Sequence, residues 1–244
     1  MEDRILIEVC CGSPEDAITA YRAGADRVEL NRALELGGLS PTPAEVSFVK
    51  KEVPGLIVIA MVRPRGGGFT YSGEEYMRML SECENLLKAG ADGIAFGFLH
   101  EDGSVDEMHA AAFVELIHRY GKQAVFHRAV DITPDRDAAF EVLIGLGIDR
   151  VLTSGGEETA MAGAEEIAWL QKTYGSRISI LPGSGINAGN AASLIKMTGV
   201  HEIHSSCKSP AKDPTARRET VDFGGHNKVS ADKVRNLRKA VDNV

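Results

Sequence analysis

The sequence predicts an α/β protein with a single domain over residues 1–244, folded as a TIM-type (β/α)8 barrel. The main observation is a repeated theme in which a helix ends on a glycine and a buried strand follows. This theme occurs four times, as AGADRVEL, AGADGIAF, LGIDRVLT and TGVHEIHS. Its glycines, Gly24, Gly90, Gly147 and Gly199, lie roughly 50 to 65 residues apart, about the length of two βα units. Four such quarters make eight units, and the length of 244 residues is close to the ~250 typical of a barrel.

The individual elements follow in order along the chain. Strands are expected at residues 5–10, 27–31, 56–63, 93–98, 123–127, 150–153, 177–181 and 202–205, with helices between them. Ser13-Pro14 gives the first helix a capping hydroxyl and a proline in its first turn. The segments 42–45 and 72–75 fit the capping box, and Asp106-Glu107 and Thr133-Pro134 mark two further helix starts.

A long polar segment at residues 207–229 interrupts this rhythm before a last helix that begins near Ser230. Loops of this length in a compact domain are usually lids, binding loops or subunit contacts, or are disordered.

Composition excludes several classes of protein. The net charge of −8 gives no electrostatic support to nucleic-acid binding. No apolar run approaches the ~20 residues of a membrane span, and the first residues lack the features of a signal peptide. The four cysteines show no disulfide-like spacing, which favours a reducing cytoplasm.

Polar and charged residues near the ends of apolar strands are the strongest functional signal, because burying an unpaired charge is unfavourable. In a barrel these side chains would meet at the carboxyl-end mouth, where acid/base and anion sites are built. We expect Glu8, Glu29, His127 and Asp131 to transfer protons there, with Asn31, Ser154 and His204 nearby. The alternative is a structural salt-bridge network, for example between Glu29 and Arg63.

The segment MVRPRGGGF carries two arginines on one face of an extended strand end. Arg63 and Arg65 could clamp a carboxylate or phosphate, and the three glycines would let the backbone approach it. The alternative is a flexible surface loop with solvated arginines.

Two glycine turns follow later strands. The first contains Ser154 and Gly155, and the second contains Gly183, Ser184 and Gly185. Barrels often bind a phosphate group near strands seven and eight, where Ser205 and Ser206 could add hydroxyl donors. Turn geometry alone could equally explain the glycines.

Cys10 and Cys11 offer thiolates at the end of the first strand, and thiolates suit copper(I). Adjacent residues on a strand face opposite sides, so both could bind one ion only if the strand ended between them. His201 and His204 would face opposite sides of their strand, and they do not form the HExxH motif.

These motifs together resemble the CutC family, which is named for copper homeostasis. The resemblance rests on EVCCGSPEDAITAYRAGADRVELN, GGLSPTPAEV, MVRPRGGGFTYS, GADGIAFGFLHEDGSVD, VFHRAVD, LGIDRVLTSGG, PGSGI and EIHSS, which span nearly the whole chain. It implies a TIM-type barrel, a cytoplasmic location, a homodimer or higher homo-oligomer, and copper binding or trafficking. The family commonly has a cysteine or serine just after the VEL strand, where this chain has Asn31, which leaves Cys10 and Cys11 as the candidate copper ligands.

Two functional hypotheses follow. In the first, Cys10 and Cys11 bind copper(I) at the barrel mouth. In the second, the protein is an enzyme or binder of a small anionic metabolite, either phosphorylated or carrying another anionic group. In the third alternative, the polar residues of the mouth have only a structural role in packing. The surface of the protein then binds partner molecules.

Overall fold

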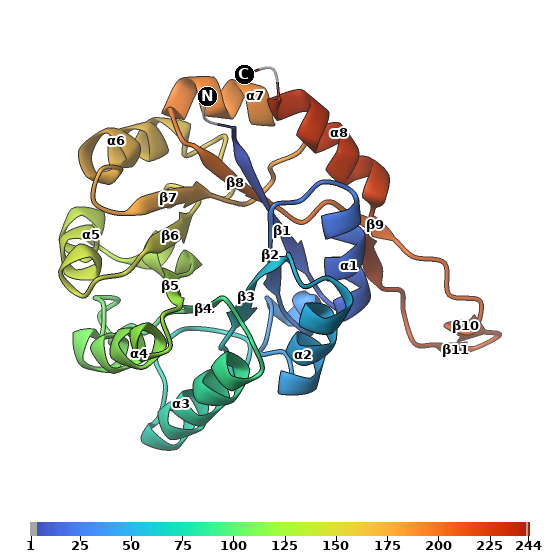
Figure 1. Cartoon of the computed structure of the whole chain (residues 1–244), viewed down its shortest axis with the longest axis horizontal. Helices are drawn as coiled ribbons and strands as arrows, with labels where there is room; N and C mark the ends of the chain where they lie inside the picture. Colours follow the sequence, from blue (N-terminus) through green and yellow to red (C-terminus); the bar gives the residue numbers. More distant parts are fainter. Residues whose placement is uncertain (1–3, 243) are drawn as a thin grey trace.

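The computed structural model describes residues 4–242 and 244 and shows a parallel barrel with helices around its outside (Figure 1). The strands are β1 Leu6–Cys11, β2 Arg27–Leu30, β3 Ile57–Met61, β4 Gly93–Phe96, β5 Gln123–Phe126, β6 Arg150–Thr153, β7 Ser179–Pro182 and β8 Glu202–Ser205. They pair in parallel in the order β7-β6-β5-β4-β3-β2-β1-β8, and β7 contacts β8 to bring the two edges together. The predicted (β/α)8 barrel is confirmed.

Helices connect the successive strands. They are α1 Pro14–Arg22, α2 Pro43–Glu52, α3 Gly73–Lys88, α4 Glu107–Arg119, α5 Arg136–Gly145, α6 Ala164–Tyr174, α7 Ala191–Thr198 and α8 Ala231–Val241, with short 3-10 helices η1 Leu34–Leu36 and η2 Arg128–Ile132. No helix within the described residues has the length and apolar character needed to cross a membrane.

The predicted helix caps are mostly confirmed. Ser13 caps α1, and Thr42 and Ser72 form complete capping boxes at α2 and α3. The start predicted at Thr133-Pro134 is wrong by two residues, because the Thr133 hydroxyl donates to Val130 O at the end of η2. Asp135 caps α5 instead.

The repeated glycines close helices as predicted. Gly24, Gly90, Gly147 and Gly199 have φ values of 109°, 101°, 81° and 69°, in the left-handed region that L-residues avoid. Each lies directly before one of the even-numbered strands β2, β4, β6 and β8.

Alternate residues of each strand face opposite sides of the barrel wall. The outward side chains, such as Ile7, Val9 and Val28, belong to the large apolar core between sheet and helices. A small apolar cluster of Ile59, Met61, Ala95 and Val125 fills part of the interior. Leu152 and Leu181 occupy further inward positions on β6 and β7, and the buried polar side chains of the described interior lie mainly on β1, β2, β6 and β8.

Residues 207–229 form a β-hairpin arm that projects from the barrel beside α1 and α8 (Figure 1). Its base pairs β9 Lys208–Pro210 with β12 Asn227–Val229, and its tip pairs β10 Arg217–Arg218 with β11 Val221–Asp222. The arm is anchored where the buried Asp16 side chain accepts a hydrogen bond from Val229 N at 2.8 Å.

Candidate functional site

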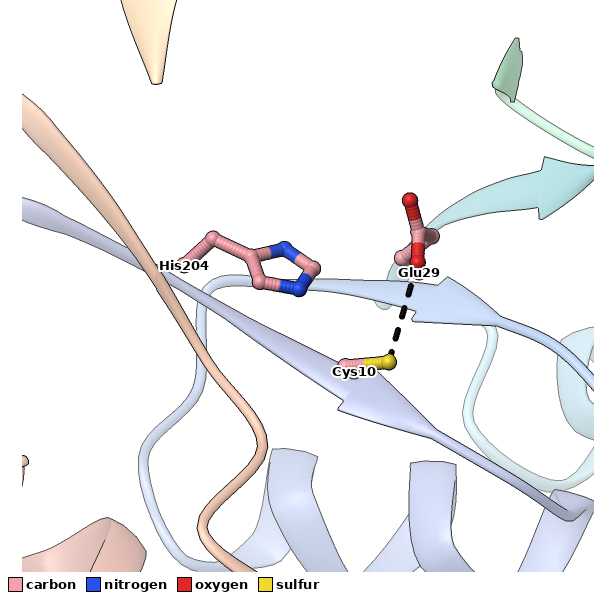
Figure 2. Close-up of side chains that lie close together, drawn as sticks. All are labelled: Cys10, Glu29 and His204. Atoms are coloured by element: carbon pink, nitrogen blue, oxygen red, sulfur yellow. Dashed lines mark hydrogen bonds between the residues drawn. The ribbon is translucent and has the colours of Figure 1, made fainter. Parts of the chain in front are cut away.

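Cys10, Glu29 and His204 converge at the carboxyl end of the barrel (Figure 2). They come from β1, β2 and β8, which are adjacent strands, and Cys10 and Glu29 are direct register partners. The Cys10 thiol donates to Glu29 Oε2 at 3.7 Å. One ligand atom from each residue lies within 4.8 Å of the other two, which makes this metal trio a candidate cation site.

An ionic network lies one inward-facing step below the metal trio, and we call it the ionic floor. Its carboxylates are Glu8 and Glu202, and its guanidinium groups are Arg27 and Arg150. Arg27 bonds Glu8 through Nε and Glu202 through Nη2, the latter at 2.6 Å. Arg150 Nε lies 2.7 Å from the other oxygen of Glu202. Each buried charge of the ionic floor therefore has an opposite charge beside it.

The ionic floor contacts the metal trio through one carboxylate. Oε1 of Glu8 lies 2.7 Å from Nδ1 of His204. Burial by itself would raise the pKa of Glu8, but the charge of Arg27 and the contacts with His204 hold it well below its usual range. Glu8 is therefore an ionised group that orients the imidazole.

The pKa values within the metal trio are shifted by burial and by neighbouring charges. Burial raises the pKa of the Cys10 thiol and of the Glu29 carboxyl. Burial by itself would lower the pKa of His204, but hydrogen bonding to Cys10 and Glu8 and the charges of Glu29 and Glu8 raise it well above its ordinary value. Strongly shifted groups gathered in one place are typical of functional sites.

The sequence predicted that Glu8, Glu29, Cys10 and His204 lie at one mouth. It did not predict that Arg27, Arg150 and Glu202 lie there as well. A salt-bridge network is present, but its members differ from the example of Glu29 with Arg63. Glu29 instead accepts from Asn31 Nδ2 at 2.9 Å. The missing members could have been found from strand alternation, because Arg27 and Glu202 precede Glu29 and His204 by two residues and share their faces.

Cys11 does not lie with Cys10. It is fully buried in the core between sheet and helices, and its thiol donates to Val9 O at 3.4 Å. The physical reason is strand alternation, which turns adjacent side chains to opposite faces while β1 continues through Cys11. The structure removes Cys11 from the candidate copper ligands.

Arg63 and Arg65 have different surroundings. The Arg63 side chain is buried and donates from Nη1 to Gly37 O at 2.8 Å and from Nη2 to Gly67 O at 2.6 Å. Arg65 is 41% exposed and is paired with Glu75 at 2.6 Å. Arg65 also donates to Thr70 O at 2.7 Å, so it organises the glycine loop itself.

His127 and Asn31 complete the inward-facing polar side chains of the mouth. His127 Nδ1 accepts from Ala129 N at 3.2 Å, and its ring packs against Phe69 with centroids 4.8 Å apart. Burial, together with the positive charge of Arg63, lowers the pKa of His127 to about 3. Asn31 Nδ2 lies 3.6 Å from Cys10 Sγ, so Asn31 joins the metal trio to the rest of the mouth.

Asp131, Ser154 and Gly155 form a separate group between β5 and β6. Asp131 accepts from Ser154 N at 3.0 Å and from Thr153 Oγ1 at 2.5 Å, and it pairs with Arg128 at 2.7 Å. Gly155 N donates to Thr153 Oγ1 at 2.9 Å. These contacts hold the loops after β5 and β6 together.

Three donors of the predicted phosphate cradle after β7 and β8 are used within the fold. Gly183 N donates to Thr153 O, Ser184 Oγ donates to Glu158 O, and Ser205 Oγ donates to Ile186 O, at 2.9, 2.7 and 2.6 Å. Gly185 adopts a φ of 74° in the same turn. Ser205 and Ser206 line a pocket of about 520 Å³ with Lys208 and Lys233, and no residue of the metal trio lines it.

Comparison with known proteins agrees with this architecture. The model of the CutC family matches residues 5–209. A CutC family protein from Treponema denticola is 46% identical over 222 residues, which cover 91% of this chain and 89% of the relative. A CutC family protein from Sinorhizobium medicae is 36% identical and covers 98% and 97% of the two chains.

Solved structures give the same family and fold. The crystal structure of the copper homeostasis protein CutC from Streptococcus agalactiae has a TM-score of 0.78 at 28% identity, over 83% of this chain and 98% of that one. A 3-hexulose-6-phosphate synthase from Salmonella typhimurium has a TM-score of 0.64 at 15% identity, over 97% and 98%, which shows a common barrel fold alone. The family model and the relatives together show that this chain belongs to the CutC family.

Proposed function

We propose that this protein binds a copper ion as its cargo at the barrel mouth, through Cys10, Glu29 and His204. The observation that carries the proposal is the convergence of a thiol, an imidazole and a carboxylate from three adjacent strands within 4.8 Å. Membership of a family that includes a protein named for copper homeostasis supports copper as the ion.

The donor set is chemically suited to copper. A thiolate favours copper(I), and an imidazole binds copper in either oxidation state. The arginines of the ionic floor do not oppose a bound cation, because Glu8 and Glu202 compensate their charges. Cys10 is the least buried member of the metal trio, so the ion would reach the thiol first.

Copper(I) competition under anaerobic conditions, with a coloured chelator, tests the proposal. Wild-type protein should bind one copper(I), and Cys10→Ser should lower the affinity by more than about 100-fold, since loss of a ligand exceeds the effect of losing an outer-shell partner. Cys11→Ser is the matched control and should retain the wild-type affinity. Equal copper(I) affinities in wild type and Cys10→Ser would show that Cys10 is not a copper ligand and would contradict the proposed site.

A second function is favoured by one observation at the same mouth. Arg63 is a buried cation whose hydrogen-bond acceptors are both neutral carbonyls. This arrangement supports an enzyme or binder that takes an anionic small metabolite, for which Glu8, Glu29, His127 and Asp131 remain the predicted proton-transfer groups. Titration of the metal-free protein with small anions tests it, and the absence of binding by every anion would exclude it.

Location and assembly belong to the same proposal. Copper(I) binding by Cys10 requires a reduced thiol, which supports a cytoplasmic location.

The hairpin arm carries Phe223, whose side chain is 85% exposed, and this supports a homo-oligomer. Light scattering of wild type and Phe223→Ser should show a dimer or higher species that the substitution weakens, and a monomeric wild type would contradict this.

A further inference from the structure

Three buried polar atoms of the mouth have no hydrogen-bond partner among the described residues. They are Asn31 Oδ1, Arg63 Nε and His127 Nε2, and the hydroxyl of Tyr71, which lies beside Arg63, is likewise without a partner. Asn31, Arg63 and His127 are 1%, 8% and 4% exposed, so water does not reach them freely. Asn31 and His127 directly follow β2 and β5, and Arg63 lies two residues after the end of β3. By alternation all three share the inward face of those strands. Buried polar groups are almost always partnered, so three orphans at one end of a barrel point to a missing ligand.

The charge of Arg63 is also unmatched. Its terminal nitrogens donate to Gly37 O and Gly67 O, and the guanidinium also interacts with the hydroxyl of half-buried Tyr71, a neutral group whose pKa is raised by burial. None of the ion pairs among the described residues includes Arg63. Arg27 and Arg150, by contrast, each have a carboxylate in contact. A buried guanidinium of this kind is unfavourable unless an anion approaches it.

The tautomer of His127 makes it a second donor. Its Nδ1 accepts the hydrogen bond of Ala129 N, so the proton of the neutral ring is on Nε2. Burial and the charge of Arg63 keep the ring neutral at physiological pH, with a pKa of about 3. Arg63 Nε–H and His127 Nε2–H are therefore two unpartnered donors in the same mouth.

Phe69 covers both of these groups. Its ring lies 5.0 Å from Arg63 Cζ and 4.8 Å from the centre of the His127 ring. The cation–π contact offsets only part of the charge of Arg63, and a phenyl ring is a weak acceptor for the two N–H donors. Phe69 follows three glycines, of which Gly67 has a φ of 84° and Gly68 has open space at its Cβ position. Movement of this loop would admit a small ligand without unfolding a strand.

We propose that the barrel mouth binds a small hydroxycarboxylate, whose carboxylate accepts from Arg63 and His127 and whose hydroxyl donates to Asn31 Oδ1. The proposal deepens the second function above and rests on it, and it is independent of copper. Asn31 Oδ1, Arg63 Nε and His127 Nε2 each receive a partner of the correct type, and the charge of Arg63 is compensated.

A carboxylate fits this mouth better than a phosphate. Glu29 lies beside Asn31, with Asn31 Nδ2 at 2.9 Å from its carboxylate. The one cation of the polar mouth without a carboxylate partner among the described side chains is Arg63. A phosphate group would bring about −1.5 to −2 charge, which exceeds what Arg63 compensates.

Calorimetric titration of the metal-free protein tests the proposal, with lactate, acetate and inorganic phosphate as probes. Lactate should bind more tightly than acetate, because acetate leaves Asn31 Oδ1 unpartnered, and more tightly than phosphate. Phe69→Ala should raise the affinity for lactate roughly 10-fold, because the phenyl ring no longer occupies the space beside Arg63 and His127. His127→Leu and Arg63→Lys should each lower it roughly 10-fold or more, as expected for loss of a charge-assisted hydrogen bond. Arg177→Gln, a surface substitution, is the control and should bind as wild type does.

The outcomes distinguish failure of the second function from failure of the hydroxycarboxylate site. If no probe binds to wild type or to Phe69→Ala, the second function and the hydroxycarboxylate site both fail. If an anion binds equally to wild type, His127→Leu and Arg63→Lys, the second function stands and this site is wrong. Tighter binding of phosphate than of lactate would overturn the ligand class. Circular dichroism checks the folding of each variant. Asn31→Asp replaces any variant that does not fold. It places a negative charge beside the carboxylate of the ligand and should abolish lactate binding.

Discussion

Glu8 and His204 are register partners on β1 and β8, and Oε1 of Glu8 lies 2.7 Å from Nδ1 of His204. The other oxygen of Glu8 is bonded to Arg27. One carboxylate thus connects the ionic floor to the metal trio, and the imidazole ring is directed toward Cys10 and Glu29 (Figure 2). Carboxylates that orient a histidine in this way are typical outer-shell partners of metal ligands.

Glu8→Gln should destabilise the protein. It removes the negative charge that compensates buried Arg27 and His204, and breaking a buried pair typically lowers the free energy of unfolding by about 3–5 kcal/mol. Urea unfolding measures the change. The matched control is Glu141→Gln, since Glu141 and Arg177 are 56% and 44% exposed and such pairs contribute about 0–1 kcal/mol. Equal losses in the two variants would contradict a special role for Glu8.

The stability conferred by His204 should depend on pH. Its pKa is raised in the folded protein, so the contribution of the protonated ring is fully present below the unfolded value of about 6.5 and is lost as the pH rises through the folded value. The difference in unfolding free energy between wild type and His204→Gln should therefore be largest near about pH 6 and shrink at higher pH. Denaturant unfolding across this range measures it, and a constant difference would refute the protonated ring.

Copper(I) affinity should rise with pH. The thiolate is the ligand, and burial raises the pKa of the Cys10 thiol, so binding must displace a proton at neutral pH. Each proton released should increase the apparent affinity about tenfold per pH unit. Competition titrations between about pH 6 and pH 8 measure the slope, and a flat profile would exclude the thiolate.

Asp131→Asn should lower stability without changing copper affinity. Its carboxylate accepts from Thr153, Ser154 and Arg128, and loss of such charge-assisted contacts typically removes about 1.5–3 kcal/mol. The melting temperature should fall by about 2–4 °C for each kcal/mol. Asp232→Asn, on a side chain that is 82% exposed, serves as control. A copper affinity that fell with the melting temperature would show that Asp131 acts on the metal trio.

Gly97→Ala should disturb the mouth at His127. A Cβ at position 97 would lie 2.5 Å from His127 Cε1 and 2.8 Å from Ala129 Cβ, which forces the ring to move. Overpacking of this kind typically lowers stability by about 1–3 kcal/mol. Lactate binding should be lost, while copper(I) binding by the metal trio should be retained. Gly121→Ala is not a matched control because its φ is 66°, so Gly73→Ala, where a Cβ meets no atom within 4 Å, is used instead.

The sequence predicted the architecture because local signals mark it. Glycines with positive φ close the helices before β2, β4, β6 and β8, and the capping boxes at Thr42 and Ser72 fix two helix starts. Both signals act within a few residues of the chain. The start of α5 was misplaced because Thr133-Pro134 has the pattern of a cap, while the Thr133 hydroxyl bonds back to η2.

Tertiary structure decided which of the polar residues act together. The sequence by itself determined that Glu8 shares a face with Cys10 and Glu29 with Asn31, because alternation along a strand is local. It could not determine that Arg27 pairs with Glu202, 175 residues away, or that Arg63 is left without a carboxylate. Those outcomes depend on barrel closure and on register between strands, which bring distant side chains into one buried space where charge and hydrogen bonding must balance.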